Sequence, residues 1–318
     1  MFNSSEYIEL KKQFDEYYHK KILPELIKAE ATRKVYLRTF VAMSVLVLIW
    51  LAFSIYSQFS HAENLADKIL SHMELINTIV VLVVCIPLYL YNRATKLNIL
   101  SSIVNFFGKF NYTHDQIEND SLLTDLILSE TMDKIEIDDN FVGTYEGVAV
   151  NITEYKKFEL NTRRINGQII EEYRKKGQSL LFVAQMNKKF EGKTIVMKDK
   201  GFLNKITKYE NLQRVSLEDI EFEKKYEVYS DNQIEARYIL TTAMINRMIH
   251  LSNIFPKMEY NFVNNKIIIN INTKKNMFEC NSFFRTLINY NRIKRNFDEF
   301  YLIFSIIKII KLNEKSIL

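Results

Sequence analysis

The pattern of apolar and polar positions is dominated by two apolar runs in the first third of the chain. The first run, Thr39 to Ser60, has 22 residues without a charge. As an α-helix it is about 33 Å long, which matches a hydrocarbon core about 30 Å thick. The second run, Leu75 to Asn92, has 18 residues and is close to the shortest length that spans a bilayer. The pattern therefore predicts a transmembrane hairpin over residues 39–92, with spans at 39–60 and 75–92.

Basic residues predict the orientation of this hairpin. Six Lys and Arg residues lie between residues 20 and 38, whereas the connector Ser60 to Glu74 holds only Lys68 against three acidic residues. Because cytoplasmic flanks of membrane spans retain Lys and Arg, we expect both termini to be cytoplasmic. A cleaved signal peptide is the alternative, but the 38 residues before the first run and the 22 within it are both too many.

Residues 1–38 are expected to form a cytoplasmic amphipathic helix. Pro24 should break or restart this helix, since proline is tolerated in a first turn but removes a hydrogen bond farther in. The restarted helix, Pro24 to Phe59, would then run into the membrane. The apolar stripe favours packing on a second cytoplasmic helix over a membrane-surface role, because acidic residues dilute its basic face. The stripe consists of Tyr7, Leu10, Phe14, Tyr17, Tyr18 and Ile22.

Residues 93–318 are expected to form one cytoplasmic α+β domain, an antiparallel sheet with packed helices. Residues 93–110 and 112–128 predict two helices with a break near Gly108. From Lys134 onward, apolar and polar residues alternate between turn signals, which indicates strands. The elements predicted after these strands are a strand at 221–230, a helix at 234–254, a hairpin about Asn264-Asn265 and a closing helix at 297–312.

Composition narrows the classes of function. A net charge of only +5, without a recognisable module, gives no reason to expect nucleic-acid binding. The two cysteines, Cys85 and Cys280, cannot form a disulfide framework and fit a reducing cytoplasm. The five histidines have no metal-ligand spacing, so the sequence predicts no catalytic, cofactor or metal site. They are His19, His61, His72, His114 and His250.

Two stretches suggest chemistry that their context does not support. NKKFEGKT, Asn187 to Thr194, nearly matches the phosphate loop GxxxxGK[ST], but Asn187 replaces the first glycine and β-branched residues follow where a helix must begin. A hairpin turn is the favoured interpretation. The acidic run Ser216 to Glu223 could supply paired carboxylates, yet a solvated strand edge explains it without a second catalytic partner nearby.

Two further stretches are the most recognisable in the chain. LLFVAQMNKKFEGKTIVMKD, Leu180 to Asp199, contains a Phe-x-Gly-x-Thr pattern, and Phe222 to Met248 contains YSDNQIEARYILT. Both resemble motifs of DUF3137, a family of bacterial membrane proteins with a domain of unknown function. Ala184 departs from the family pattern, which has glycine there. The layout of helix, paired spans and cytoplasmic domain is also similar, and the resemblance implies a bacterial inner-membrane location without implying an activity.

Asp231, Glu235 and Arg237 are the best polar candidates for an interaction site. They lie at a predicted strand-to-helix junction, where an acidic residue can cap the helix while the other two face outward. The structural alternative is that Asp231 only caps the helix and that Glu235 pairs with Arg237 or a neighbour.

A second candidate surface is the basic stretch Lys156 to Lys208, which holds 14 Lys and Arg against five acidic residues. Because turns at one end of antiparallel hairpins cluster, its basic residues are expected to share a face that docks on anionic lipid headgroups or an acidic protein partner. A solvated basic surface is the alternative. The clusters are Arg163-Arg164 before Asn166-Gly167, Arg174-Lys175-Lys176 before Gly177, and Lys188-Lys189 before Gly192.

Two classes of function remain open. The first is a membrane-anchored cytoplasmic scaffold or regulatory binding module in contact with the bilayer, favoured because the sequence shows no catalytic motif. The second is a membrane-bound enzyme with an unrecognised site around Asp231, Glu235 and Arg237. A transporter is disfavoured, because two spans without an ionisable residue enclose no path unless the protein forms a homo-oligomer, which the sequence leaves open. A deep pocket with convergent polar groups would favour the enzyme.

Overall fold

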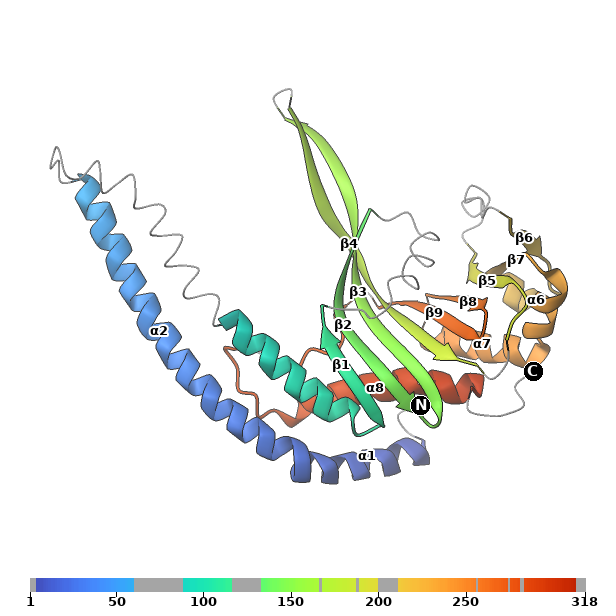
Figure 1. The fold of residues 1–318 in the computed structure, drawn as a ribbon, viewed down its shortest axis with the longest axis horizontal. Coiled ribbons are helices and arrows are strands. Elements are labelled where there is room, and N and C mark those ends of the chain that lie inside the picture. The colour runs from blue at the N-terminus through green and yellow to red at the C-terminus, as the bar shows by residue number, and fades with distance from the viewer. Residues whose placement is uncertain are drawn as a thin grey trace. The chain divides into compact units, whose positions relative to one another are not determined.

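The computed structural model of the chain contains two compact units (Figure 1). The helical unit comprises Met1–Phe106 and Glu279–Lys294, and the sheet unit comprises Phe107–Phe278 and Arg295–Leu318. The residues that the structure describes are 4–59, 88–115, 133–165, 168–186, 189–199, 211–255, 257–273, 275–280 and 283–312.

The helical unit begins with α1 (Ser5–Tyr17), a π-helical turn η1 (Tyr18–Ile22) and α2 (Leu23–Phe59). In the π turn the backbone N–H of Leu23 donates to the carbonyl of Tyr18. Pro24 follows as the second residue of α2, where its missing N–H costs little. The predicted restart at Pro24 and the predicted helix 24–59 are therefore confirmed.

Of the predicted transmembrane hairpin the structure shows one candidate span, and the two-helix hairpin itself is not shown. Among the described residues one helix, Ser5–Ala52, is long and apolar enough to cross a membrane, and none of its most apolar window is buried. Residues 88–104 are helical. Residues 75–87 of the second predicted span, and the connector 60–74, lie outside the described residues.

The helical unit packs as expected from the apolar stripe. The Phe14 ring lies 5.2 Å from that of Phe106, and the Tyr17 hydroxyl donates to the Ser102 carbonyl at 3.1 Å. Glu30 and Arg33 form a buried ion pair at 2.7 Å, and Glu30 also accepts a hydrogen bond from the backbone N–H of Leu287. Hydrogen bonds from Arg33 hold the pKa of Glu30 below its usual value. This pair thus fastens the segment around Leu287 to α2.

The sheet unit is built on a nine-stranded sheet with the order β1-β2-β3-β4-β9-β8-β5-β7-β6, in which every neighbouring pair is antiparallel. The predicted α+β class with an antiparallel sheet is therefore confirmed. The strands are β1 (Lys109–His114), β2 (Lys134–Tyr145), β3 (Val148–Ile165), β4 (Gln168–Gln185), β5 (Lys193–Lys198), β6 (Gln213–Val215), β7 (Tyr226–Ser230), β8 (Met258–Val263) and β9 (Lys266–Asn272). The helices are α5 (Ile220–Glu223), α6 (Gln233–Ile239), α7 (Thr242–Ile254) and α8 (Tyr290–Ile310), of which α8 begins in the helical unit.

Aromatic side chains fill the core between α8 and the β1–β2 end of the sheet. The Tyr145 and Phe304 rings stack with centroids 4.5 Å apart, and Phe141 and Phe300 meet edge to face at 4.9 Å. Alternate residues of a strand point to the same face, so Phe141 and Tyr145 both face α8. Asp139, two residues before Phe141, faces the same way, which places a carboxyl at the margin of this aromatic core.

Several predicted elements differ from the observed ones. Residues 109–114 form strand β1 rather than the end of the first predicted helix (93–110) and the start of the second (112–128), because Phe110 and Tyr112 are buried with a period of two. The acidic run 216–223 ends in helix α5 instead of a strand. The predicted helix 234–254 is divided, since the Thr241 side chain caps α7 by accepting from the N–H of Met244. The hairpin about Asn264-Asn265 is confirmed by the β8–β9 pairing, and the closing helix begins at Tyr290.

A two-stranded ribbon extends from the sheet (Figure 1). β2 pairs with β3 as far as Phe158, and β9 pairs with β4 only from Ser179 onward. Between these limits residues 159–165 and 168–174 pair with each other and with no other described strand. We call these two segments the ribbon. The predicted turn at Gly177 is wrong, because β4 continues through it and the pairing with β3 only skips Lys176, as in a β-bulge.

Candidate functional site

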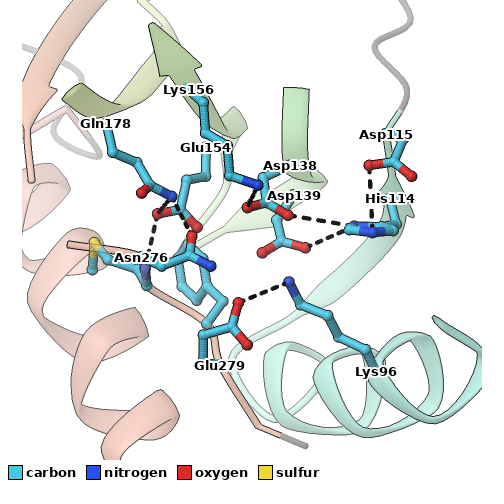
Figure 2. Close-up of polar contacts among 12 residues, drawn as sticks. Lys96, His114, Asp115, Asp138, Asp139, Glu154, Lys156, Gln178, Asn276 and Glu279 are labelled. Carbon is cyan, nitrogen blue, oxygen red and sulfur yellow. Dashed lines mark hydrogen bonds and ion pairs between the residues drawn. The ribbon is translucent and has the colours of Figure 1, made fainter. Parts of the chain in front are cut away.

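A cluster of ionisable side chains lies where β1, β2 and β3 meet, and a break in the β2 ladder creates it. Ile137 pairs with Tyr155 and Asp139 with Glu154, so the pairing skips Asp138. In a regular strand Asp138 and Asp139 would point to opposite faces, but a bulge re-aims a side chain. Both carboxyl groups therefore reach the same neighbour, His114 (Figure 2).

His114 ends β1 directly opposite Asp139. Its Nδ1 lies 3.4 Å from Asp139 Oδ1 and 3.8 Å from Asp138 Oδ1, and its Nε2 lies 3.3 Å from Asp115 Oδ1. The Asp139 side chain is fully buried, with 0% exposed, and the Tyr112 hydroxyl donates to its Oδ1 at 2.5 Å. The cluster thus combines one imidazole with two carboxyl groups that water barely reaches, those of Asp138 and Asp139, and with the exposed carboxyl group of Asp115.

Further partners on β3 complete the cluster. Lys156 Nζ lies 2.7 Å from Asp138 Oδ2, and Glu154 Oε1 accepts hydrogen bonds from Gln178 Nε2 at 3.0 Å and from the N–H of Met277 at 2.8 Å (Figure 2). Glu154 lies directly across from Asp139 on the adjacent strand. Like charges opposite each other in a sheet are destabilising, so these donors are needed to hold the two carboxyl groups side by side.

The donor set defines what the cluster could do chemically. The ligand atoms of His114, Asp138 and Asp139 all lie within 4.8 Å of one another, close enough to hold a metal ion. Imidazole and carboxylate ligands suit several divalent metals. The Lys156 ammonium already neutralises Asp138, however, and would compete with a cation. The same groups can equally exchange a proton between His114 and Asp139.

The sequence prediction missed these residues. His114 was interpreted as a scattered histidine, and its buried carboxylate partners, Asp138 and Asp139, lie more than 20 residues away in the chain. The one local signal is the pair Asp138-Asp139, which interrupts the alternation of IEIDDNFV. Two adjacent acidic residues inside an apolar strand are typical of a bulge or of a buried polar site.

The two recognisable sequence motifs meet in a single structural junction between β5 and β7. Asp231 Oδ1 accepts a hydrogen bond from the N–H of Lys193 at 2.7 Å, and the hydroxyls of Thr194 and Ser230 lie 3.0 Å apart. Gly192 has φ +92°, and a Cβ there would lie 2.2 Å from Asp231 Oδ1. The glycine, the threonine and the Ser-Asp pair therefore form one interlocked corner.

The predicted role of Asp231 as a helix cap is wrong. Asn232 is the N-cap of α6, because its side chain accepts from the N–H of Glu235 at 3.1 Å. Arg237 is exposed and donates to the carbonyl of Gln233 at 3.3 Å. Asp231 instead links β7 to β5, one residue away from the position that the capping hypothesis required. An interaction role for Asp231, Glu235 and Arg237 stays a prediction.

The basic clusters do not gather at one end of the hairpins, in contrast to the prediction. Arg163 and Arg164 lie near the end of the ribbon, whereas Arg174, Lys175 and Lys176 lie within β4 close to its bulge. Arg163, Arg164 and Arg174 are exposed and make no ion pair with any described residue. Lys188 lies outside the described residues. Docking at Arg174, Lys175 and Lys176 stays a prediction.

Three comparisons with known proteins bear on the identity of the chain. Comparison with curated proteins gives no significant match. One solved structure, the crystal structure of the mycobacterial trehalose monomycolate transport factor A, TtfA, is similar at 11% identity with a TM-score of 0.35. The alignment covers 66% of this chain and 95% of that chain, and a likeness this low has no bearing on function.

The family described as "Protein of unknown function (DUF3137)" matches residues 176–312. This range contains both motif stretches, Leu180 to Asp199 and Phe222 to Met248. It begins in β4 and ends after α8, so it includes the junction between β5 and β7. Residues 176–312 of the chain therefore match the DUF3137 family model, as the motifs indicated.

Proposed function

We propose that the protein is a membrane-anchored binding module that holds a cytoplasmic domain at the inner membrane of a bacterium. The observation that supports anchoring most directly is α2, whose uncharged part exposes apolar side chains such as Leu46 and Leu48, 66% and 65% exposed. Apolar side chains on an isolated helix of this length are stable only in a bilayer or under a partner. In this proposal residues 75–92 form the second span and both termini are cytoplasmic.

The ribbon is the surface that best suits a protein partner. Cross-strand neighbours share a face, so Leu160, Tyr173, Arg164 and Ile169 lie on one face of the ribbon. Tyr173 and Ile169 are exposed, and Tyr and Arg are the residues enriched in protein interfaces. Arg164 lies on this face, whereas Arg163 and Arg174 lie on the opposite face. None of the three makes an ion pair with a residue that the structure describes, so the ribbon has an affinity for acidic groups.

A protein partner is favoured over a lipid surface by the charge balance of the ribbon. The ribbon carries three basic and three acidic residues. Docking on anionic headgroups depends on a local excess of Lys and Arg, which this segment does not have. We therefore propose an acidic protein surface as the partner, and anionic lipid as the alternative that the experiment distinguishes.

The test is photocrosslinking in native membranes. A photoreactive amino acid replaces Tyr173 in the full-length protein, and the matched control carries it at Tyr238 on α6, since both tyrosines are 50% exposed. We expect a defined protein adduct from position 173 that is absent from position 238, and direct binding of that purified protein that is lost in Arg163→Glu with Arg164→Glu. Adducts with lipid alone, or equal adducts from both positions, would contradict the proposal.

A membrane-bound enzyme remains the second candidate function, and the His114 cluster is the specific observation in its favour. An imidazole next to two carboxyl groups is a combination used for proton transfer. The full burial of Asp139 argues against access by a substrate. His114→Ala should consequently leave crosslinking from position 173 unchanged, whereas loss of a measurable enzymatic turnover in this variant would favour the enzyme.

A further inference from the structure

The helical unit contains a groove of about 930 Å³ between α2 and the helix at residues 88–104. The two helices are joined along it by hydrogen bonds, from the Tyr91 hydroxyl to the Ala29 carbonyl at 3.0 Å and from the Ser102 hydroxyl to Glu25 Oε2 at 2.7 Å. Small residues such as Thr32 and Ala94 line its floor, so the groove stays open between these contacts. Its volume lies in the range of small-molecule sites, about 300–1,000 Å³.

The groove changes from apolar to polar along its length. At one end lie Tyr36 and Leu90, both exposed, and Tyr36 is three residues before the uncharged run that begins at Thr39. At the other end lie Glu25, Lys28 and Ser102. Glu25 and Tyr36 are eleven residues apart, which is about 16 Å along a helix. The apolar end therefore adjoins the predicted membrane, and the polar end is farthest from it.

One charge at the polar end is available to a ligand. Glu25 already accepts the hydrogen bond from Ser102. Lys28 is exposed, and its ammonium makes no ion pair with any residue that the structure describes. An ammonium group is a common binding partner for phosphate.

We propose that this groove binds one membrane phospholipid, with an acyl chain along Tyr36 and Leu90 and the phosphate at Lys28. The inference rests on the proposed anchoring of α2, because only then does the apolar end open toward the bilayer. Each part of the lipid meets matching chemistry: the chain leaves the bilayer along apolar side chains, and the headgroup lies among polar ones. A free phosphate ion would use only the exposed Lys28 and should bind weakly.

The experiment uses the full-length protein in phosphatidylcholine nanodiscs containing a phosphatidylglycerol with a photoreactive acyl chain. Mass spectrometry locates the adducts. Adducts at residues 40–59 are expected for any helix in a bilayer, and their absence would contradict the anchoring itself. Adducts at residues 28–36 and 93–98, outside both proposed spans and up to about 16 Å from the start of the run, are expected only if the groove holds a lipid. Adducts confined to residues 40–59 and 75–92, the two proposed spans, would overturn the inference and leave the anchoring intact.

Two pairs of variants make the test specific to the groove. Ala94→Trp fills it, whereas Ala31→Trp adds the same bulk at an exposed position of α2 outside it. Lys28→Glu removes the phosphate contact, and Lys34→Glu makes the same charge change outside the groove. We expect Ala94→Trp and Lys28→Glu to lower the groove adducts at least fivefold and their controls to leave them unchanged.

Equal effects of the two members of each pair would overturn the proposal. Loss of the groove adducts in millimolar inorganic phosphate would also overturn the proposal, because it would show that the groove binds a simple anion. If Ala94→Trp does not fold, as judged from its near-ultraviolet circular dichroism, the Lys28→Glu and Lys34→Glu pair decides alone.

Discussion

Gly192 is the residue on which the corner between β5 and β7 depends. Its φ of +92° is unfavourable for any other residue, and a Cβ would lie 2.2 Å from Asp231 Oδ1. Gly192→Ala should therefore lower the free energy of unfolding by about 2 kcal/mol, within the range of about 1–3 kcal/mol for strained backbone. The measurement is the melting temperature of the full-length protein in detergent.

Gly177→Ala is the control for this prediction. Gly177 lies in β4 with no positive φ, and a Cβ there would meet nothing within 4 Å. Alanine in a strand interior should be neutral or raise stability by about 0.5 kcal/mol relative to glycine. Equal losses of stability in both variants would contradict the prediction that the corner between β5 and β7 requires glycine at position 192.

Burial determines how much each ion pair around β2 contributes to the stability of the fold. The pairs Lys156–Asp138 and Lys134–Glu136 have the same N–O distance of 2.7 Å, but Asp138 is 5% exposed and Glu136 46%. Lys156→Ala leaves a buried carboxylate without its cation and should cost about 3 kcal/mol. Lys134→Ala breaks a solvated pair and should cost less than about 1 kcal/mol. Thermal unfolding of the two variants compares them, and a larger loss for Lys134→Ala would refute this account of the cluster.

At the scale of elements, Pro24 shows how α2 can follow α1 without a break. The π turn Tyr18–Ile22 ends one residue before Leu23, and Pro24 then occupies the first turn of α2. Pro24→Ala should change stability by less than about 1 kcal/mol, whereas Ala31→Pro, eight residues into the same helix, should cost about 3 kcal/mol or more. Circular dichroism at 222 nm during heating measures both, and a severe loss for Pro24→Ala would mean that the proline itself shapes the turn.

At the scale of the whole molecule, the membrane topology makes a direct prediction. If both spans cross the bilayer, the connector Ser60 to Glu74 is the only part exposed outside the cell. In a background with Cys85→Ser and Cys280→Ser, a cysteine at Ala62 should react with an impermeant maleimide in intact cells. A cysteine at Asn166 should react only after lysis. Labelling of Asn166 in intact cells would reverse the assignment.

The helices and strands with a strong local pattern could be predicted from the sequence alone. The helix 24–59, the hairpin about Asn264-Asn265 and the strands after Lys134 all agree with the structure. Apolar periodicity and turn chemistry depend on residues only a few positions apart, so they can be recognised in the sequence without the tertiary structure. The strand 109–114 was missed because six residues contain too few periods to separate strand from helix.

The candidate site was decided by tertiary structure. The bulge at Asp138 and the pairing of β1 with β2 bring His114 to two carboxyl groups, although 23 residues separate His114 from Asp138 in the chain. Asp231 caps no helix, because the start of β5 offers it the N–H of Lys193 instead. Charge and periodicity are properties of the chain, whereas the partner of a polar side chain depends on strand register. Register is set by packing across the whole sheet, and a shift of one residue would turn each of these side chains to the other face.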